Sequence, residues 1–437
     1  MKIKMRKRLS AAGLLEAVRT RFTRIPDRLS GRTMYPLSNC LMSALAMFSL
    51  KYRSLLQFDQ AAGDEPALYH NLHSLFGVDQ VPSDTYMRER LDGLLPQRLR
   101  RAFKACFSAV QRGKALNLFE FMDGYYLVSN DGTGFFHSDN VHCEHCCEKH
   151  HRNGRVSYYH QIMSTVLVHP DQSVVLPLAL EPIIKQDGLN KNDCERNASK
   201  RLLTALRAMH PKLKMVILED GLHSNAPHIE LLKSLHFRYI IGAKPSDHQW
   251  LFEWVKASQC ETATHERAGT HYEFRWLNNI PLNESNEALR VNFLECHEIS
   301  PKGKQQVFSW VTDFVITRHN VFQLMQGGRA RWKIENETFN TLKTQDYHFE
   351  HNFGHGYQHL STVMAYLMML AFLIDQIQQL CCPQFQAALK HCRMRRIRLW
   401  ERLRGMFYTC TIDSWEALFM GIADPCIFHL SLTPDSS

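Results

Sequence analysis

The chain has 437 residues, of which 45% are hydrophobic and 11% aromatic, so it can bury a large core in two or three domains, and its composition excludes a disordered chain. Its 13 cysteines are odd in number and no secretory signal is evident, which favours reduced thiols over a disulfide framework. The formal charge of +9 includes basic runs in residues 1–32 and 390–404, which suit a polyanionic partner, with a solvated charged face or contact with acidic lipids as the alternatives.

Residues 1–118 are predicted to be mostly helical. Apolar residues recur at helical spacing from Leu14 to Phe22, residues 38–50 form an apolar stretch, and a cap-like Ser83-Asp84 opens a third helix. Together with its basic residues, this pattern indicates a DNA-binding region. A helical brace on the rest of the protein is the alternative.

Residues 119–244 are predicted to alternate between strands and helices. Three successive strands are expected, followed by helix, strand, helix and strand; the expected ranges are 125–129, 158–168, 174–180, 192–209, 214–219, 227–235 and 238–243. This order is that of a ribonuclease H-like α/β core. In such a core the sites lie at the carboxyl ends of the strands.

The rest of the chain divides into three further regions. Residues 245–318 are predicted to be a β-rich insertion, with strands at 272–277, 288–294 and 306–314. These strands are expected to form a sheet of their own and not to continue the core. A core helix is expected within 319–360, and a basic helical region within 361–437. The apolar run at 363–374 ends at Asp375 and is short for a membrane span, so it is predicted to be a buried helix and no membrane contact is expected.

Three acidic residues in different local settings are candidate metal ligands. Asp131 ends an aromatic, β-rich run, Asp220 ends the apolar run 215–219, and Glu335 lies in a helical segment. Two strand-end aspartates and a helical glutamate can hold a pair of Mg²⁺ or Mn²⁺ ions, which prefer oxygen ligands and suit phosphodiester chemistry. In this arrangement Asp131 would bridge both ions, Asp220 would hold one and Glu335 the other. Taken singly, each residue is equally compatible with a turn or a solvated helix face.

Three neighbours of Glu335 are candidates for contact with nucleic-acid phosphates. Arg331 lies one helical turn before it and Lys343 about two turns after it, so both are predicted to share its face. Trp332 is predicted either to stack on a base or to pack.

These residues resemble the signature of bacterial insertion-sequence DDE transposases, the group with a β-sheet insertion before the glutamate. In that family a Tyr is followed after two residues by Arg, after three more by Glu and after six more by Lys. Arg331 and Glu335 fit this spacing, Gly328 stands at the tyrosine position, Lys343 comes one residue late, and Glu337 is therefore a rival for the third carboxylate.

The resemblance extends over roughly residues 120–365. Asp131-Gly-Thr and Glu219-Asp220-Gly-Leu are similar to the two aspartate motifs of the family, and residues 158–161 and 192–195 also look related. The resemblance is weak in the N-terminal region.

The resemblance implies a cytoplasmic, nucleoid-associated enzyme that acts as a homodimer on double-stranded DNA. Such an enzyme binds the terminal inverted repeats of its own element, hydrolyses the DNA and joins the freed 3′-hydroxyl to target DNA. Many members form a hairpin intermediate on the transposon end. Because the tyrosine is missing here, the sequence does not decide whether this protein forms one. The alternatives are a DNA-binding relative without catalytic activity and another ribonuclease H-like nuclease.

A dense cluster of Cys and His lies between the first two predicted strands. Cys143 and Cys146 have zinc-knuckle spacing, and Cys147, His150 and His151 are candidates to complete a tetrahedral set. The alternative is a loop that packs on the core or contacts the DNA backbone. His355 and His359 are predicted to pack or to contact DNA.

Overall fold

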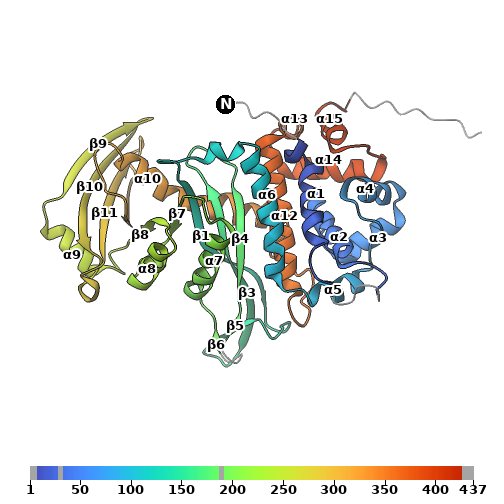
Figure 1. Ribbon diagram of the computed structural model, residues 1–437, viewed down its shortest axis with the longest axis horizontal. Coiled ribbons are helices and arrows are strands. Elements are labelled where there is room, and N and C mark those ends of the chain that lie inside the picture. Colours follow the sequence, from blue (N-terminus) through green and yellow to red (C-terminus); the bar gives the residue numbers. More distant parts are fainter. Residues whose placement is uncertain (1–6, 28–32, 187–190, 426–437) are drawn as a thin grey trace, which may run out of the picture.

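The computed structural model describes residues 7–27, 33–186 and 191–425 (Figure 1). Residues 1–6 and 28–32 of the basic N-terminal run, and residues 426–437 of the predicted C-terminal region, lie outside the described residues. A body of helices occupies one end of the molecule and a long mixed sheet runs from it to the other end (Figure 1). The fold is therefore mixed α/β, as predicted.

Ten strands form this sheet, in the order β2-β3-β1-β7-β8-β12-β11-β10-β9, with β4 also paired to β3. They are β1 (Tyr126–Ser138), β2 (Cys147–His150), β3 (Val156–Val168), β4 (Leu176–Ile183), β7 (Met215–Glu219), β8 (Arg238–Gly242), β9 (Glu261–Arg267), β10 (Thr270–Pro281), β11 (Arg290–Ile299) and β12 (Gln305–Thr312). The short strands β5 (Lys185–Gln186) and β6 (Lys191–Asn192) pair with each other.

The middle of the sheet has a simple topology. Strands β1, β3 and β4 form an antiparallel meander, whereas β7 pairs parallel to β1 and β8 parallel to β7. Helices connect the parallel strands, as a parallel pairing requires. The seven elements predicted between residues 119 and 244 are all present, in the predicted order.

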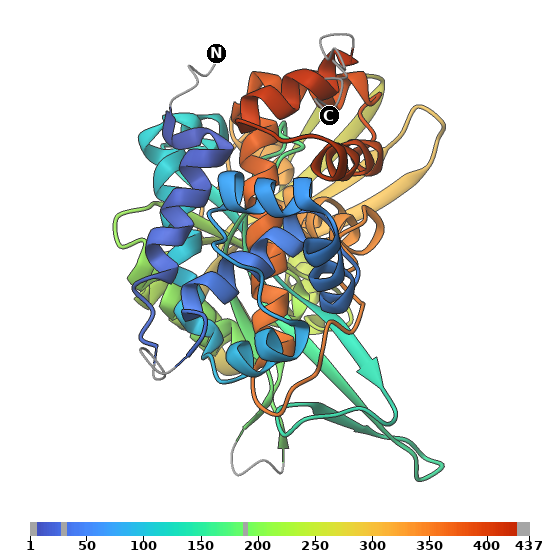
Figure 2. The ribbon, with the colours of Figure 1, turned by 90° about the vertical axis from the view of Figure 1, so that its right-hand side faces the viewer.

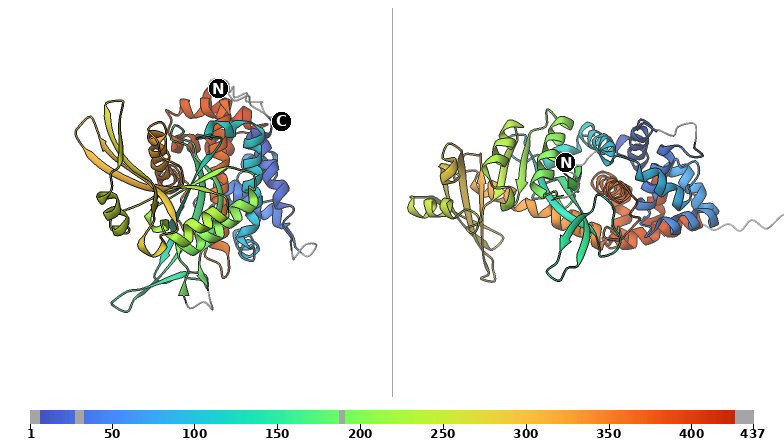
Figure 3. Two further views of the ribbon diagram at one scale, coloured as in Figure 1. Left: turned by 60° about the vertical axis from the view of Figure 1, so that its left-hand side comes forward. Right: turned by 90° about the horizontal axis from the view of Figure 1, so that it is seen from below.

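The β-rich insertion continues this sheet, which corrects the expectation of a separate sheet. Strand β12 pairs antiparallel with β8, through Trp310 opposite Gly242, and β11, β10 and β9 follow outward. Without β12, the outer edge of β8 would have unpaired backbone N–H and C=O groups, and β12 forms hydrogen bonds with them. Figure 3 shows the inserted strands at the far end of the molecule, with α9 beside them.

Strand β1 is longer than predicted, and this corrects the position of Asp131. The parallel pairing with β7 covers only Tyr126–Ser129, whereas the antiparallel pairing with β3 continues to Ser138. Asp131 therefore lies inside β1, two residues beyond its last contact with β7. Asp220 directly follows β7, as predicted.

Helices cover both faces of the sheet. Helix α7 packs on β3 and β4 from one face, while α6 and α12 pack on β4 from the other. The helices that accompany the sheet are α7 (Glu195–Met209), α8 (Ala226–Ser234), α9 (Gln249–Ala257), α10 (Val321–Arg329) and α11 (Asn340–Thr344).

The helical body is built from both ends of the chain. It contains α1 (Ala11–Phe22), α2 (Leu37–Ser49), α3 (Leu55–Asp64), α4 (Pro66–Phe76), α5 (Asp84–Asp92), α6 (Arg100–Arg112), α12 (Leu360–Cys381), α13 (Pro383–His391), α14 (Arg396–Thr409) and α15 (Trp415–Ala423). Helix α12 runs through its middle, in contact with α1, α2, α5 and α6 (Figure 2).

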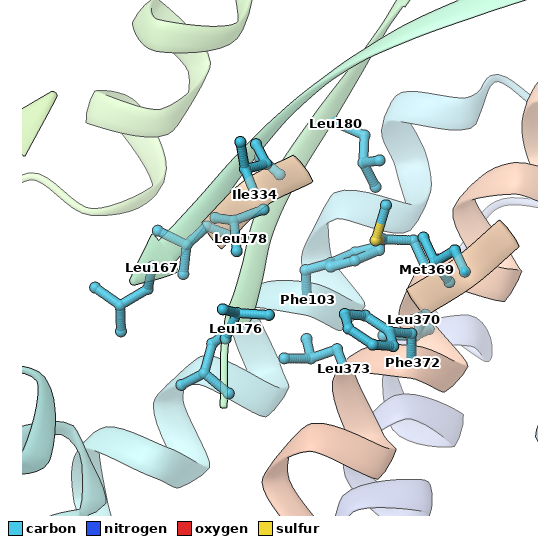
Figure 4. Packing of buried hydrophobic residues seen from close by; sticks show 14 of the residues in the cluster. Phe103, Leu167, Leu176, Leu178, Leu180, Ile334, Met369, Leu370, Phe372 and Leu373 are labelled. Carbon is cyan, nitrogen blue, oxygen red and sulfur yellow. The ribbon is translucent and has the colours of Figure 1, made fainter. Parts of the chain in front are cut away.

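Helix α12 is long and apolar enough to cross a membrane by length and composition, but 89% of its apolar window is buried inside the protein. Its inner side chains join one core with the sheet. Phe103 of α6, Leu180 of β4 and Met369 of α12 meet there (Figure 4). Each such side chain contributes about 1.5–3 kcal/mol when fully buried. This core fixes the helical body to the strand next to β3, and so to the sheet that carries Asp131.

Candidate functional site

Two of the predicted acidic residues, Asp131 and Glu335, meet at Arg331, and Asp220 directly follows β7, the neighbour of β1 in the sheet. The Arg331 Nη1 atom lies 2.7 Å from Asp131 Oδ2 and 3.1 Å from Glu335 Oε1. The Ser129 hydroxyl donates a hydrogen bond of 3.0 Å to the Arg331 carbonyl, which holds this helical segment against β1. The structure thus brings residues that are 200 positions apart into direct contact.

Alternation along β1 explains why Asp131 faces this segment. Side chains two residues apart in a strand share a face, so Ser129 and Asp131 both point to Arg331, while Asn130 points to the opposite face under α7. Glu335 lies in a π-helical segment, Ile334–Phe339, which follows a 3₁₀ turn over Ala330–Trp332. Such segments are frequent at functional sites because they displace side chains from the regular helical positions.

Asp220 begins the turn after β7 and its orientation is set locally. Its Oδ1 accepts a hydrogen bond of 3.0 Å from the Leu222 amide and lies 3.3 Å from His223 Nδ1. Glu195, at the start of α7, is a further carboxylate beside the site, since its Oε1 lies 2.7 Å from where a Cβ on Gly132 would be. The sequence pointed to Glu195 only as part of a motif, and it gave no signal for His223.

The carboxylates act on one another electrostatically. Burial raises the pKa of Asp131 to about 7; Arg331 opposes this rise, whereas Glu335 and Asp220 add to it. The pKa of Asp220 is lowered, first by its hydrogen bond with His223. Because both Glu335 and Asp220 influence Asp131, this aspartate is the central member of the group.

This donor set fits hard divalent cations. The three groups are carboxylates, their mutual repulsion favours a bound positive charge, and such oxygen ligands suit Mg²⁺ or Mn²⁺. Asp131, Asp220 and Glu335 are the residues that would hold the ions.

The remaining predicted residues differ in their distance from this group. Trp332 has 45% of its surface exposed, and its ring lies 4.4 Å from the Arg331 guanidinium carbon. Lys343 forms an ion pair of 2.8 Å with Glu350 and lines a hollow along the outer half of β1. It does not join Arg331 at the carboxylates. The rival Glu337 lies in the same π-helical segment as Glu335, but Arg331 pairs with Glu335.

Gly328 stands where the resemblance led us to expect a tyrosine, and the structure explains the glycine. A Cβ at this position would lie 2.5 Å from the Trp310 ring, so no larger side chain fits. The glycine leaves room for the Trp310 side chain of β12 against α10.

A buried polar network supports the site from behind. Glu219 Oε1 accepts hydrogen bonds from Asn130 (2.6 Å) and Ser199 (3.1 Å), and Glu219 Oε2 lies 2.6 Å from His228 Nε2. Burial alone would raise the pKa of Glu219, but His228, His223 and these hydrogen bonds lower it to about 2. Asn130 and Glu219 directly precede Asp131 and Asp220, so this network fixes both strands at the site.

We expect Glu219→Ala to lower the free energy of unfolding by about 3–5 kcal/mol, because it leaves His228 and two further polar groups buried without their partner. Glu230→Ala, at an exposed position of α8, is the control and should change it by less than about 0.5 kcal/mol. Urea unfolding at pH 7 measures both. Equal effects of the two variants would contradict the supporting role of Glu219. The contribution of the Glu219 charge is present above its ordinary pKa of 4.5 and is lost as the pH falls through about 2.

A second group of possible ligands lies on the outer half of β1 and β3. It contains Cys143, Cys146, His160 and His355, whose ligand atoms all lie within 4.8 Å of one another. This corrects the predicted zinc set. Cys147 and His150 are not members: the Cys147 thiol faces the Ile183 carbonyl, and His150 is exposed beside Glu148. His160 follows Cys146 by 14 positions, which is an ordinary spacing for zinc ligands, and the sequence prediction missed it. His355 is 209 positions from Cys146, so no local pattern could indicate it.

The comparisons with known proteins give little. No protein-family model matches the chain, and no curated protein matches it. A cryo-EM structure of the piggyBac transposase synaptic complex with hairpin DNA matches with a TM-score of 0.38 and 8% sequence identity, over 98% of this chain and 80% of that chain. A similarity of this size identifies neither a family nor an activity, so the function has to be argued from the site.

Proposed function

We propose that the protein is a DDE transposase of a bacterial insertion sequence, which cuts DNA at the terminal inverted repeats of its element and joins the 3′-hydroxyl ends to target DNA. The observation that carries this proposal is the contact of Asp131 and Glu335 with Arg331, with Asp220 close enough to raise the pKa of Asp131. Because two DNA ends must be processed together, the proposal includes a homodimer on DNA. It also places the protein in the cytoplasm, on the nucleoid.

The topology supports the proposal. The order β4-β3-β1-β7-β8, with only β3 antiparallel to the others, is the order of a ribonuclease H-like core. In that class the site lies where the parallel strands end. Asp220 follows β7 there, and Asp131 lies just beyond the parallel part of β1.

Each residue has a role in this proposal. A pair of Mg²⁺ ions, when bound, supplies activation of the attacking oxygen and stabilisation of the leaving oxygen. Arg331 positions Asp131 and Glu335, and its positive charge beside them would also attract a DNA phosphate. His223 orients the Asp220 carboxylate. The exposed ring of Trp332 offers a surface on which a base can stack.

The helical body supplies a basic surface for the DNA backbone. Arg21 of α1 and Arg101, Lys104 and Arg112 of α6 line one hollow between these helices. Clustered cations of this kind bind phosphates without regard to sequence and make affinity depend on salt. This surface supports the assignment of residues 1–118 to DNA binding.

The test uses a labelled duplex that carries the DNA flanking the protein's own gene, with a target plasmid and Mg²⁺. We expect cleavage at the end of the repeat, a free 3′-hydroxyl and a joined product. Asp220→Asn should abolish both steps and keep DNA binding. Cleavage without a joined product would indicate a nuclease, and binding without cleavage a relative that lacks catalytic activity. Loss of binding in Asp220→Asn would make Asp220 a structural residue.

A further inference from the structure

The group of Cys143, Cys146, His160 and His355 lies apart from the acidic site and shares no residue with it. Cys143 and Cys146 belong to the loop between β1 and β2, His160 to β3, and His355 to the segment between α11 and α12. Cys146 and His355 are 209 positions apart in the sequence. Cys146, His160 and His355 are buried, although they come from a loop, a strand and a second connecting segment.

Three distances within this group are close to those expected in a tetrahedral metal site. His160 Nε2 lies 3.5 Å from Cys143 Sγ and 3.4 Å from Cys146 Sγ, and His355 Nε2 lies 3.2 Å from Cys146 Sγ. Bonds of about 2.3 Å from zinc to sulfur and about 2.0 Å to nitrogen place the two atoms about 3.5 Å apart at the tetrahedral angle. The side chains are thus already near the required separations.

The two cysteines form a compact turn. The Cys146 amide donates a hydrogen bond of 3.1 Å to the Cys143 carbonyl, and the Cys143 amide lies 3.5 Å from the Cys146 sulfur. A pair of cysteines separated by two residues is the usual spacing in structural zinc sites. Amide contacts to sulfur favour the thiolate, which is the form that binds metal.

Aromatic rings enclose the two histidines. An irregularity in the β1–β3 register between Gly134 and Phe136 brings two successive phenylalanines to this side. The Phe135 ring stacks on His160 at 5.6 Å, and the Phe136 ring lies 4.5 Å from His355. The group is thereby shielded from water, which strengthens the bonds of a bound cation.

The backbone around His355 is built to hold this residue inward. Gly354 and Gly356 both have positive φ, at 125° and 65°. A Cβ at these positions would lie 2.0 Å from Arg88 Nη1 and 2.4 Å from Asp92 Oδ1. Asp92 also accepts hydrogen bonds from the amides at the start of α12, including those of His359 and Leu360. This segment is therefore fixed in one conformation.

Simple packing does not account for His355. Among the described residues its Nδ1 has no hydrogen-bond partner, so the contact of Nε2 with Cys146 is the polar interaction that explains its burial. A buried polar group without a partner is costly. A metal bond at Nε2 would replace this single contact with sulfur, which is a weak hydrogen-bond partner, and would give a reason for the burial of the ring.

We propose that Cys143, Cys146, His160 and His355 bind one structural zinc ion. Two sulfurs and two imidazole nitrogens complete a tetrahedron with no open position, which is typical of structural and not catalytic zinc. The ion ties the outer half of β1 and β3 to the segment that connects α11 with α12. It therefore links the strands that carry Asp131 to the chain that follows Glu335, without taking part in the reaction at the carboxylates.

The zinc content of the protein, purified without chelators, is the first measurement, and it needs no DNA and no cleavage. We expect about one zinc ion per chain, and less than a tenth of that in Cys143→Ser and His355→Ala. Cys147→Ser and His351→Ala are matched controls, since each changes the same residue type nearby but outside the group, and both should keep the zinc. Absence of zinc from the intact protein, or equal loss in Cys147→Ser and Cys143→Ser, would overturn the proposal.

A second measurement uses only the intact protein, so it tests the proposal even where the variants fail to fold. The intact protein, stripped of metal and titrated with Co²⁺, should show the strong visible absorption of tetrahedral cobalt and the near-ultraviolet charge transfer of thiolate ligands. Removal of the metal should lower the melting temperature by about 5 °C or more. Weak octahedral absorption would overturn the proposal. So would a disulfide between Cys143 and Cys146 in a peptide map of the non-reduced protein, because zinc is bound by free thiolates.

Discussion

Asp131→Asn is expected to lower the rate of Mg²⁺-dependent DNA cleavage by at least about 10³-fold, which corresponds to about 4 kcal/mol of transition-state stabilisation. Asparagine keeps the shape of the side chain but removes the charge at the centre of the group. Arg331 keeps Glu335 as its partner, so the fold should be preserved. The measurement is single-turnover cleavage of the labelled duplex, with DNA binding measured on the same samples.

A matched pair of variants tests the third carboxylate. Glu335→Gln is expected to match the loss of Asp131→Asn, whereas Glu337→Gln should keep cleavage within about threefold of the intact protein. The two residues lie in the same π-helical segment and differ in their contact with Arg331. The opposite result, with only Glu337→Gln inactive, would assign the third carboxylate to Glu337. Activity in all three variants would refute the site.

Local patterns were sufficient to predict most of the elements. The strand predicted at 158–168 and the helical spacing from Leu14 to Phe22 are both present, in β3 and α1. The pairing of distant strands was not predictable in the same way. Nothing in β12 alone indicates that it pairs with β8, because edge pairing depends on which backbone groups remain free after the core has formed.

In the candidate site, too, residues with a local sequence pattern could be predicted, whereas contacts between distant segments could not. The order and setting of Asp131, Asp220 and Glu335 led to a group that the fold does bring together. The second group was only half predictable. Cys143 and Cys146 have a recognisable spacing, but His355 reaches them through the glycine-rich segment before α12, and no local pattern describes such a contact.

Asp375 is the clearest case of a residue whose role needed the structure. In the sequence it ends an apolar run, whereas in the structure α12 continues past it to Cys381. Its Oδ2 lies 2.8 Å from Lys51 Nζ and accepts a hydrogen bond of 2.6 Å from the Tyr347 hydroxyl. The Lys51 side chain is fully buried, and its ammonium group lies 4.3 Å from the centre of the Tyr347 ring and 4.2 Å from that of Trp400.

We expect Asp375→Ala to lower the free energy of unfolding by about 3–5 kcal/mol, since it leaves the Lys51 charge buried without its counter-ion. Burial lowers the pKa of Lys51, and Asp375 is the first group that opposes this effect. Urea unfolding followed by far-ultraviolet circular dichroism measures the loss. Glu401→Ala, at an exposed position of α14, is the control and should change stability by less than about 0.5 kcal/mol.

The double variant Lys51→Met, Asp375→Ala separates a buried charge from a packing defect. Methionine is similar in length to lysine and fits between the Tyr347 and Trp400 rings without a charge to compensate. If the unpaired charge causes the loss, the double variant should be more stable than Asp375→Ala by about 2 kcal/mol or more. If the two substitutions add, the loss comes from the cavity at Asp375, and the ion pair contributes little to the attachment of α12 to the N-terminal helices.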